Sequence, residues 1–129
     1  MVAATDTLVL VDAANVMGSR PDGWWRDRTG AVQRLLDELQ GWAAGHPGDV
    51  VVIVEGVVRG GIEEGDHGSV EIQHATRSGV DAADDRIVEL VRTSGHVSIE
   101  VVTADRELRR RVGALGAKVV GPRTLFDRL

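Results

Sequence analysis

The chain has 129 residues and no cysteine, so it has room for one domain and cannot use disulfides or thiolate metal ligands. Hydrophobic residues make up 43 %, which supports an ordinary globular core, and no run reaches the roughly 18–20 apolar residues of a membrane span. The net charge of −5 argues against general nucleic-acid binding over the whole surface. We expect a single domain over residues 1–129, and the lack of a signal-peptide pattern in residues 1–6 favours the cytoplasm.

The first third of the chain predicts a strand, a loop and a helix. Residues 7–12 are a short, β-branched apolar run, which is typical of a buried strand. Residues 13–30 contain Gly18 and Pro21 and are expected to form a loop. Apolar residues then recur at helical spacing, which predicts a helix over residues 28–44.

The middle of the chain predicts a second buried strand and a weaker one. Residues 49–55 form the second apolar run, and the Gly-rich, acidic residues 59–68 predict a loop. Val70 and Ile72 indicate a short, half-exposed edge strand, which could pair with a second copy of the chain or a partner protein.

The last part of the chain continues the alternation of helices and strands. The patterns predict helices over residues 81–94 and 105–115, strands over 97–103 and 117–120, and a final helical turn or two over 124–129. Alternating buried strands and helices predict an α/β fold, a three-layer α/β/α sandwich around a mostly parallel sheet of four or five strands.

Three of the predicted strands have a carboxylate at their end or just after it: Asp12, Glu55 and Asp105. Ligands of open α/β sheets bind outside the carboxyl ends of the strands, so these side chains are expected to converge. Clustered carboxylates need a cation, and oxygen ligands suit Mg²⁺ or Mn²⁺. Asp12 and Asp105 could instead be helix N-caps. Asn15 could form an Asx-turn, or orient Asp12 or a water molecule.

A further acidic group, which includes Asp84 and Asp85, begins the helix expected at residues 81–94. Acids in a first turn favour the helix dipole, so a structural role is one interpretation, and Asp81 is the expected cap. Asp84 falls on the face that carries Ile87 and Val91, where an unpaired charge is costly. This position favours Asp84 and Asp85 as further metal ligands.

Positive charge is concentrated at the end of the chain. Residues 105–129 carry a balance of +4, so residues 1–104 carry −9. Arg106, Arg109 and Arg110 could contact an RNA backbone, or they could be a solvated helix face. Trp24 and Trp25 could stack on unpaired bases, although packing of one ring under the loop is the simpler interpretation.

Three motifs resemble the NYN domains of the PIN-like nuclease superfamily, and the bacterial YacP-like group most of all. They are Val11-Asp12-Ala13-Ala14-Asn15-Val16, Ala83-Asp84-Asp85-Arg86-Ile87-Val88, and the segment Val102-Thr103-Ala104-Asp105-Arg106-Glu107-Leu108-Arg109. The resemblance implies a PIN-like fold and a metal-dependent ribonuclease that acts on single-stranded or structured RNA. It carries the family's site roles to Asp12, Asn15, Asp84, Asp85 and Asp105. Glu55 stands where YacP-like proteins usually have Asp.

Two other functions compete with a nuclease. A PIN-like module that binds RNA or protein with weak or no catalysis would keep the same residues. A receiver-like signalling domain fits the size and the Thr103-Ala104 pair, but the first strand ends in one acid rather than two and the second in Glu. Dinucleotide binding is disfavoured because no G-x-G-x-x-G motif follows the first strand.

Overall fold

The computed structural model describes residues 6–21, 23–54, 62–75 and 82–129. The strands in this part of the chain are β1 (Thr7–Asp12), β2 (Asp49–Val54), β3 (Gly65–His67), β4 (Val70–His74), β5 (Ser98–Val102) and β6 (Lys118–Val120). The helices are α1 (Ala13–Gly18), α2 (Arg28–Ala43), α3 (Ala82–Thr93), α4 (Arg106–Ala114) and α5 (Pro122–Arg128), with a short 3₁₀ helix, η2 (Trp24–Arg26).

The strands form one sheet in the order β3-β4-β2-β1-β5-β6. Every pairing is parallel except that of β3 with β4. The described sheet therefore has six strands rather than the expected four or five, because β3 adds an antiparallel edge. The predicted α/β/α fold with a mostly parallel sheet is confirmed.

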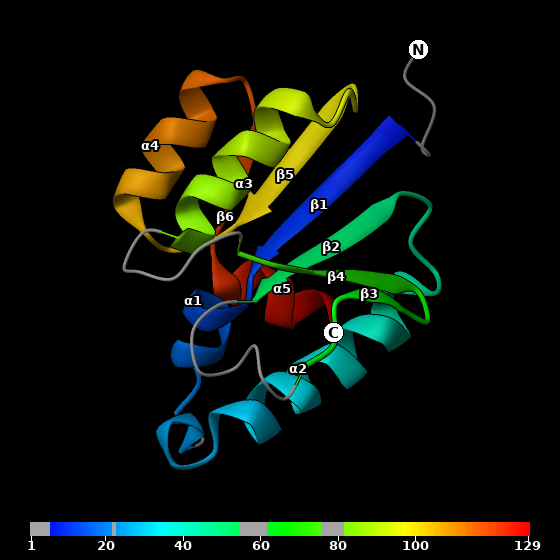
Figure 1. Cartoon of the computed structure of the whole chain (residues 1–129), viewed down its shortest axis with the longest axis vertical. Coiled ribbons are helices and arrows are strands. Elements are labelled where there is room, and N and C mark those ends of the chain that lie inside the picture. The colour runs from blue at the N-terminus through cyan, green and yellow to red at the C-terminus, as the bar shows by residue number, and fades with distance from the viewer. Residues whose placement is uncertain (1–5, 22, 55–61, 76–81) are drawn as a thin grey trace.

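Helices cover both faces of the sheet (Figure 1). Val9, Val11 and Val52 face a core built with α1, α2 and α5. The alternate strand residues, including Leu8, Leu10 and Ile53, face a second core built with α3 and α4. Burial of both faces explains why β1 and β2 are continuous apolar runs in the sequence.

Strand order reverses beside β1, and we call the carboxyl ends of β1 and β5 at this reversal the crevice, after the feature that open α/β sheets form at such points. From β1 the chain moves outward through β2 to β4, then crosses back through α3 to β5 on the other side of β1 (Figure 1). Val11 is in register with Val102, so the residues that leave these two strands begin side by side. Such reversal points are where open α/β sheets bind ligands.

Three local predictions were wrong. The segment after β1 is the short helix α1 rather than a loop, and η2 follows it. Residues 65–67 belong to β3 rather than to a loop. The strand with Val70 and Ile72 is not an edge, because it pairs with β3 on one side and β2 on the other. Both side chains are buried, and the argument for pairing a second copy at β4 is lost.

The longer predicted helices and strands are present, with ends shifted by a residue or two. Within the four described stretches, none of the helices is both long and apolar enough to cross a membrane.

Candidate functional site

Asp12 is the buried carboxylate at the end of β1. Asp12 is 5 % exposed. In the part of the chain that the structure describes, the other buried polar residue is Thr103. One oxygen of Asp12 accepts the backbone N–H of Asn15 at 3.4 Å and caps α1. The other accepts the hydroxyl of Thr103 at 3.2 Å. Asp12 is therefore an N-cap, and it also contacts the residue that follows the neighbouring strand β5.

Thr103 joins the ends of β1 and β5 through its hydroxyl group. The oxygen that donates to Asp12 also accepts the backbone N–H of Asp105 at 3.1 Å. Asp105 in turn caps α4 by accepting the N–H of Leu108 at 2.9 Å. The buried hydroxyl group thus links the carboxylate of Asp12 to the backbone of Asp105, at the point where the strand order reverses.

Asn15 makes a second link between the two strand ends. Its amide oxygen accepts the backbone N–H of Ala104 at 2.8 Å. This contact with the residue after Thr103 is neither of the alternatives that the sequence left open for Asn15, and it arises because α1 places Asn15 one turn beyond Asp12. The structure therefore brings together Asp12, Asn15, Thr103 and Asp105.

Asp84 and Asp85 lie in the first turn of α3 and are half-buried. The preceding residue, Ala83, packs in the same core as Leu10 and Ile53, near the carboxyl ends of β1 and β2. Asp85 forms an ion pair with Arg111 of α4 at 3.0 Å, with both side chains partly exposed. This ion pair joins the first turn of α3 to the last turn of α4.

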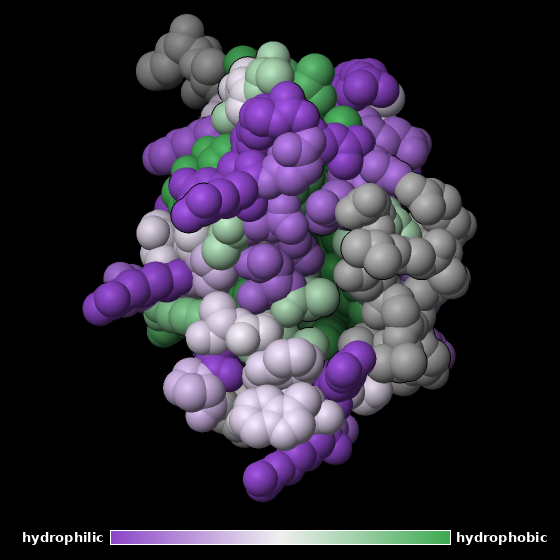
Figure 2. All heavy atoms as spheres, turned by 90° about the vertical axis from the view of Figure 1, so that its left-hand side faces the viewer, coloured by the Kyte–Doolittle hydropathy of each residue, from purple (hydrophilic) through white to green (hydrophobic). Residues whose placement is uncertain are grey.

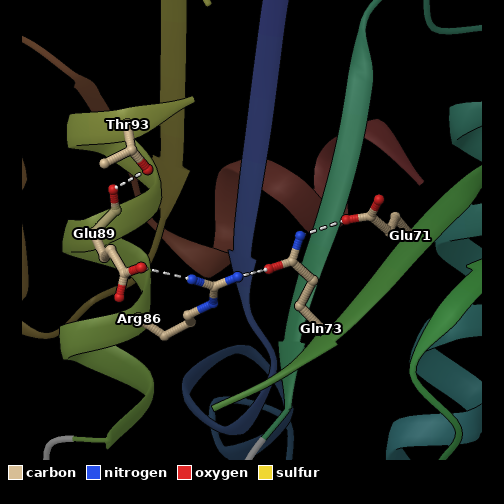
Figure 3. Close-up of polar contacts among 5 residues, drawn as sticks. All are labelled: Glu71, Gln73, Arg86, Glu89 and Thr93. Carbon is tan, nitrogen blue, oxygen red and sulfur yellow. Dashed lines mark hydrogen bonds and ion pairs between the residues drawn. The ribbon is translucent and has the colours of Figure 1, made fainter. Parts of the chain in front are cut away.

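Arg86, next to this acidic pair, ties α3 to the sheet (Figure 3). Its guanidinium donates to Glu89 on the same helix at 3.0 Å and to the Gln73 side chain of β4 at 2.6 Å. Gln73 donates onward to Glu71 at 2.5 Å. This chain of contacts fixes how the first turn of α3 sits against β4, and so fixes the direction in which that turn presents its acids.

Glu55, the remaining expected ligand, lies outside the described residues, as does the expected cap Asp81. In the part of the chain that is described, no three side chains of His, Asp or Glu stand close enough to hold a metal ion. The chemistry of the donors nevertheless fits Mg²⁺ or Mn²⁺, since the oxygens of Asp12, Asn15 and Asp105 are hard donors. Mg²⁺ is commonly held by one or two carboxylates with water and substrate phosphates, a mode that does not need three grouped side chains.

The predicted basic residues lie on the outer side of α4. Arg106, Arg109 and Arg110 are exposed, on a side of the molecule that is largely hydrophilic (Figure 2). Arg110 forms an ion pair with Glu107, and its hydrogen bond lowers the pKa of that carboxyl group. The charge of Arg110 is therefore partly offset, whereas Arg106 and Arg109 have no ion pair with any described residue.

The two neighbouring tryptophans differ in environment. Trp24 is half-buried and packs against the core on the α2 side of the sheet. Trp25 is 56 % exposed, and its ring stands perpendicular to that of Trp24 with 6.0 Å between centroids. The packing of Trp24 agrees with the simpler interpretation, in which one ring lies under the loop. That interpretation does not apply to Trp25, whose ring is exposed.

Thr103 and Arg111 are the parts of this site that sequence reasoning did not select. The signal for Thr103 was its place just before a strand-end carboxylate, where a cap and a ligand contact look alike. Arg111 lies among exposed arginines, and its pairing with Asp85 depends on how α3 and α4 pack. Neither contact can be recognised from the residue pattern of one segment, because each joins two segments that are far apart in the sequence.

Comparison with known proteins agrees with this geometry. The family model of the YacP-like NYN domain matches residues 9–129. No curated protein matches the chain. Two crystal structures of Rae1 (YacP) from Bacillus subtilis have similar folds. The W164L mutant is 20 % identical with a TM-score of 0.77, and the match covers 94 % of this chain and 73 % of that one.

The second Rae1 structure is 21 % identical with a TM-score of 0.77 and covers 93 % of this chain and 71 % of the other. At this identity the likeness establishes the fold. The family match spans nearly the whole chain, including all three motifs around Asp12, Asp84 and Asp105. This chain belongs to the YacP-like NYN family of PIN-like, nuclease-type domains.

Proposed function

We propose that the protein is a cytoplasmic, metal-dependent ribonuclease whose active site lies at the carboxyl ends of β1 and β5. The observation that carries the proposal is the linked group of Asp12, Asn15, Thr103 and Asp105 at the reversal of strand order. Family membership supports the same reaction class. It also removes the receiver-like alternative, which belongs to a different family.

In this proposal Asp12 and Asp105, with Asp84 or Asp85, hold Mg²⁺ or Mn²⁺. The ion, when bound, makes water a better nucleophile and neutralises charge on the phosphodiester. Thr103 keeps the carboxylate of Asp12 in place by donating a hydrogen bond to it. Asn15 holds the start of α4 against the start of α1, and so keeps Asp105 beside Asp12.

The exposed arginines of α4 supply the contacts to RNA. Helix α4 begins at the crevice, immediately after Asp105, so Arg106 and Arg109 stand within its first turn. Arginine contacts to phosphate fix the register of a nucleic acid without reading its sequence. Arg110 is assigned the same role with a smaller contribution, because Glu107 already binds it. Glu55 stays a further candidate ligand.

A direct test is RNA cleavage by the purified protein in Mg²⁺, Mn²⁺ or EDTA, with single-stranded and hairpin substrates in parallel. We expect cutting only with a divalent ion. Attack of water on the phosphorus, with the 3′ oxygen as the leaving group, leaves a 5′-phosphate on one product and a 3′-hydroxyl on the other, and both ends can be identified. Cleavage that persists in EDTA would contradict the proposal.

A second candidate is a module that binds RNA or protein with little or no catalysis. The observation in its favour is that Asp12 and Asp105 both serve as N-caps, while the described residues do not group three metal-binding side chains. This candidate predicts RNA binding without cutting in any of the three conditions above, from a protein that is folded by circular dichroism.

A further inference from the structure

We propose that Trp25 is a stacking platform for one unpaired base of the RNA, and that Trp24 is its support rather than a second platform. The inference rests on the proposed function for the identity of the polymer, and it narrows the substrate to RNA with an unpaired nucleotide beside the cleavage site.

The first argument is the exposure of Trp25. Of the chain's three tryptophans and one phenylalanine, all of them described, it alone is exposed, at 56 %. Every base has a flat π-face, and an exposed indole ring can stack on any of them. The other three rings are partly covered and pack against the same core.

Trp25 also packs against a neighbouring ring. The edge of one ring meets the face of the other at 90°, so Trp24 restricts the orientations that are open to Trp25. Trp24 itself lies against the end of α1: a Cβ placed on Gly18 would stand 3.7 Å from its ring. A ring whose orientations are restricted loses less conformational freedom when a base stacks on it.

The third argument is the charge around the ring. The guanidinium of Arg26 lies 5.9 Å from the centre of the Trp25 ring, and that of Arg28 lies 5.6 Å from the Trp24 ring. Both arginines are exposed, and neither forms an ion pair with any residue that the structure describes. A base on Trp25 would bring its phosphates beside two cations, which favours a nucleic acid over an apolar protein segment.

The fourth argument is the position of the ring relative to the candidate active site. Helix α1 begins directly after Asp12 and ends at Gly18, against which Trp24 lies. Its six residues span about 9 Å. The turn that carries the tryptophans lies at the same end of the molecule as the carboxyl ends of the strands (Figure 1). Helix α1 thus connects Asp12 of the candidate site to the turn that carries the platform.

The experiment measures binding of a fluorescently labelled RNA decamer in EDTA, where the proposed nuclease does not cut, with the RNA checked for integrity afterwards. Wild type, Trp25→Ala, Trp25→Phe and Val97→Ala are compared on the single strand and on the blunt duplex of the same sequence. Val97 is a matched control, because it is 65 % exposed and precedes β5 at the opposite end of the sheet.

We expect Trp25→Ala to weaken single-strand binding roughly 5- to 150-fold and to leave duplex binding unchanged. Trp25→Phe keeps a stacking surface and should lose much less, and Val97→Ala should lose nothing. Decamers with one abasic position supply the decisive comparison. At one position the missing base should weaken binding by wild type but not by Trp25→Ala, as expected when ring and base contact each other.

Equal losses on single strand and duplex, no loss at all, or no measurable single-strand binding by wild type would overturn the platform. If Trp25 binds a protein partner instead, its replacement would cause no loss of RNA binding. RNA cleavage with and without a divalent ion tests the nuclease proposal independently of the platform. Trp25-dependent binding without metal-dependent cutting would remove the enzyme and keep the platform, and cutting without Trp25-dependent binding would do the reverse.

Discussion

At the scale of single residues, the candidate site depends on one buried hydroxyl group. The side chain of Thr103 is fully buried and bonds both Asp12 and the backbone of Asp105. The chain uses these carboxylates as N-caps as well, so capping and metal binding are not exclusive interpretations of a strand-end aspartate. A cap uses one oxygen to accept an N–H group, and a carboxylate has two oxygens.

We predict that Thr103→Val destabilises the fold by about 1–3 kcal/mol despite its similar shape, because it leaves buried polar partners without the hydroxyl. Cleavage should fall at the same time, since Asp12 loses the donor that holds it. Thr103→Ser keeps the hydroxyl and should retain most of the cleavage rate. Urea unfolding and single-turnover cleavage give the two readouts. A Val variant equal to wild type in both would contradict the assignment.

The positions of Asp12 and Asp105 could be predicted from the sequence because each follows a recognisable strand. The bond between Thr103 and Asp12 could not, since it depends on the register of β1 with β5, residues separated by most of the chain. The pairing of Asp85 with Arg111 could not be predicted either, because it depends on how α3 packs against α4. The roles of all these side chains toward a metal or RNA stay predictions.

At the scale of elements, long periodic segments were predictable and short ones were not. Helix α2 has an apolar face over four turns. Helix α1 has six residues, too few to show a period, and Gly18, the glycine that ends it, favours a loop when only the sequence is considered. Strand β3 has no apolar run, because its residues are ordered by pairing with β4 rather than by burial.

The contact between α3 and α4 gives a test of Asp85. Exchanging the charges in Asp85→Arg with Arg111→Asp should restore the stability that either single change removes, within about 0.5 kcal/mol for a partly exposed pair. If Asp85 also serves the metal, cleavage in the double variant should stay about tenfold or more below wild type. The measurements are urea unfolding and cleavage rate. Recovery of both would show that Asp85 acts only as the partner of Arg111.

At the scale of the whole molecule, the order of the strands decides where the site forms, and order has no local signature. The alternation of strands and helices predicted the layers. That β1 lies between β2 and β5, and hence that Asp12 meets Thr103, follows only from the packed sheet. The distribution of charge, by contrast, can be read from the sequence: the net charge of −5 includes a basic helix, α4, that begins at the crevice.

Because the positive charge is concentrated on α4, we expect the affinity for RNA to depend weakly on salt concentration, and mainly through the arginines of this helix. A protein that neutralises Z phosphates of a single strand gives a slope of about −0.7Z in log K against log salt concentration. Replacing Arg106 and Arg109 together by Ala should therefore reduce the slope by about 1.4. Arg92→Ala, in the last turn of α3 away from the crevice, is the matched control and should leave the slope unchanged. Equal slopes for all variants would contradict contact through α4.

The central claim is that Asp12 and Asp105 do more than cap helices, and Asp→Asn substitution separates the two roles. Asparagine is as good an N-cap as aspartate, so the fold should be kept, while the charge needed to bind a cation is lost. Asp37 on α2, an exposed acid bonded to Gln33, supplies the control Asp37→Asn.

The measurement is single-turnover RNA cleavage in Mn²⁺ by wild type, Asp12→Asn, Asp105→Asn, both together, and Asp37→Asn. We expect a loss of about 100-fold or more for each site variant, little further loss in the double variant because the residues act as a unit, and a rate within about twofold of wild type for Asp37→Asn. Wild-type cleavage by folded Asp12→Asn and Asp105→Asn proteins would contradict the central claim.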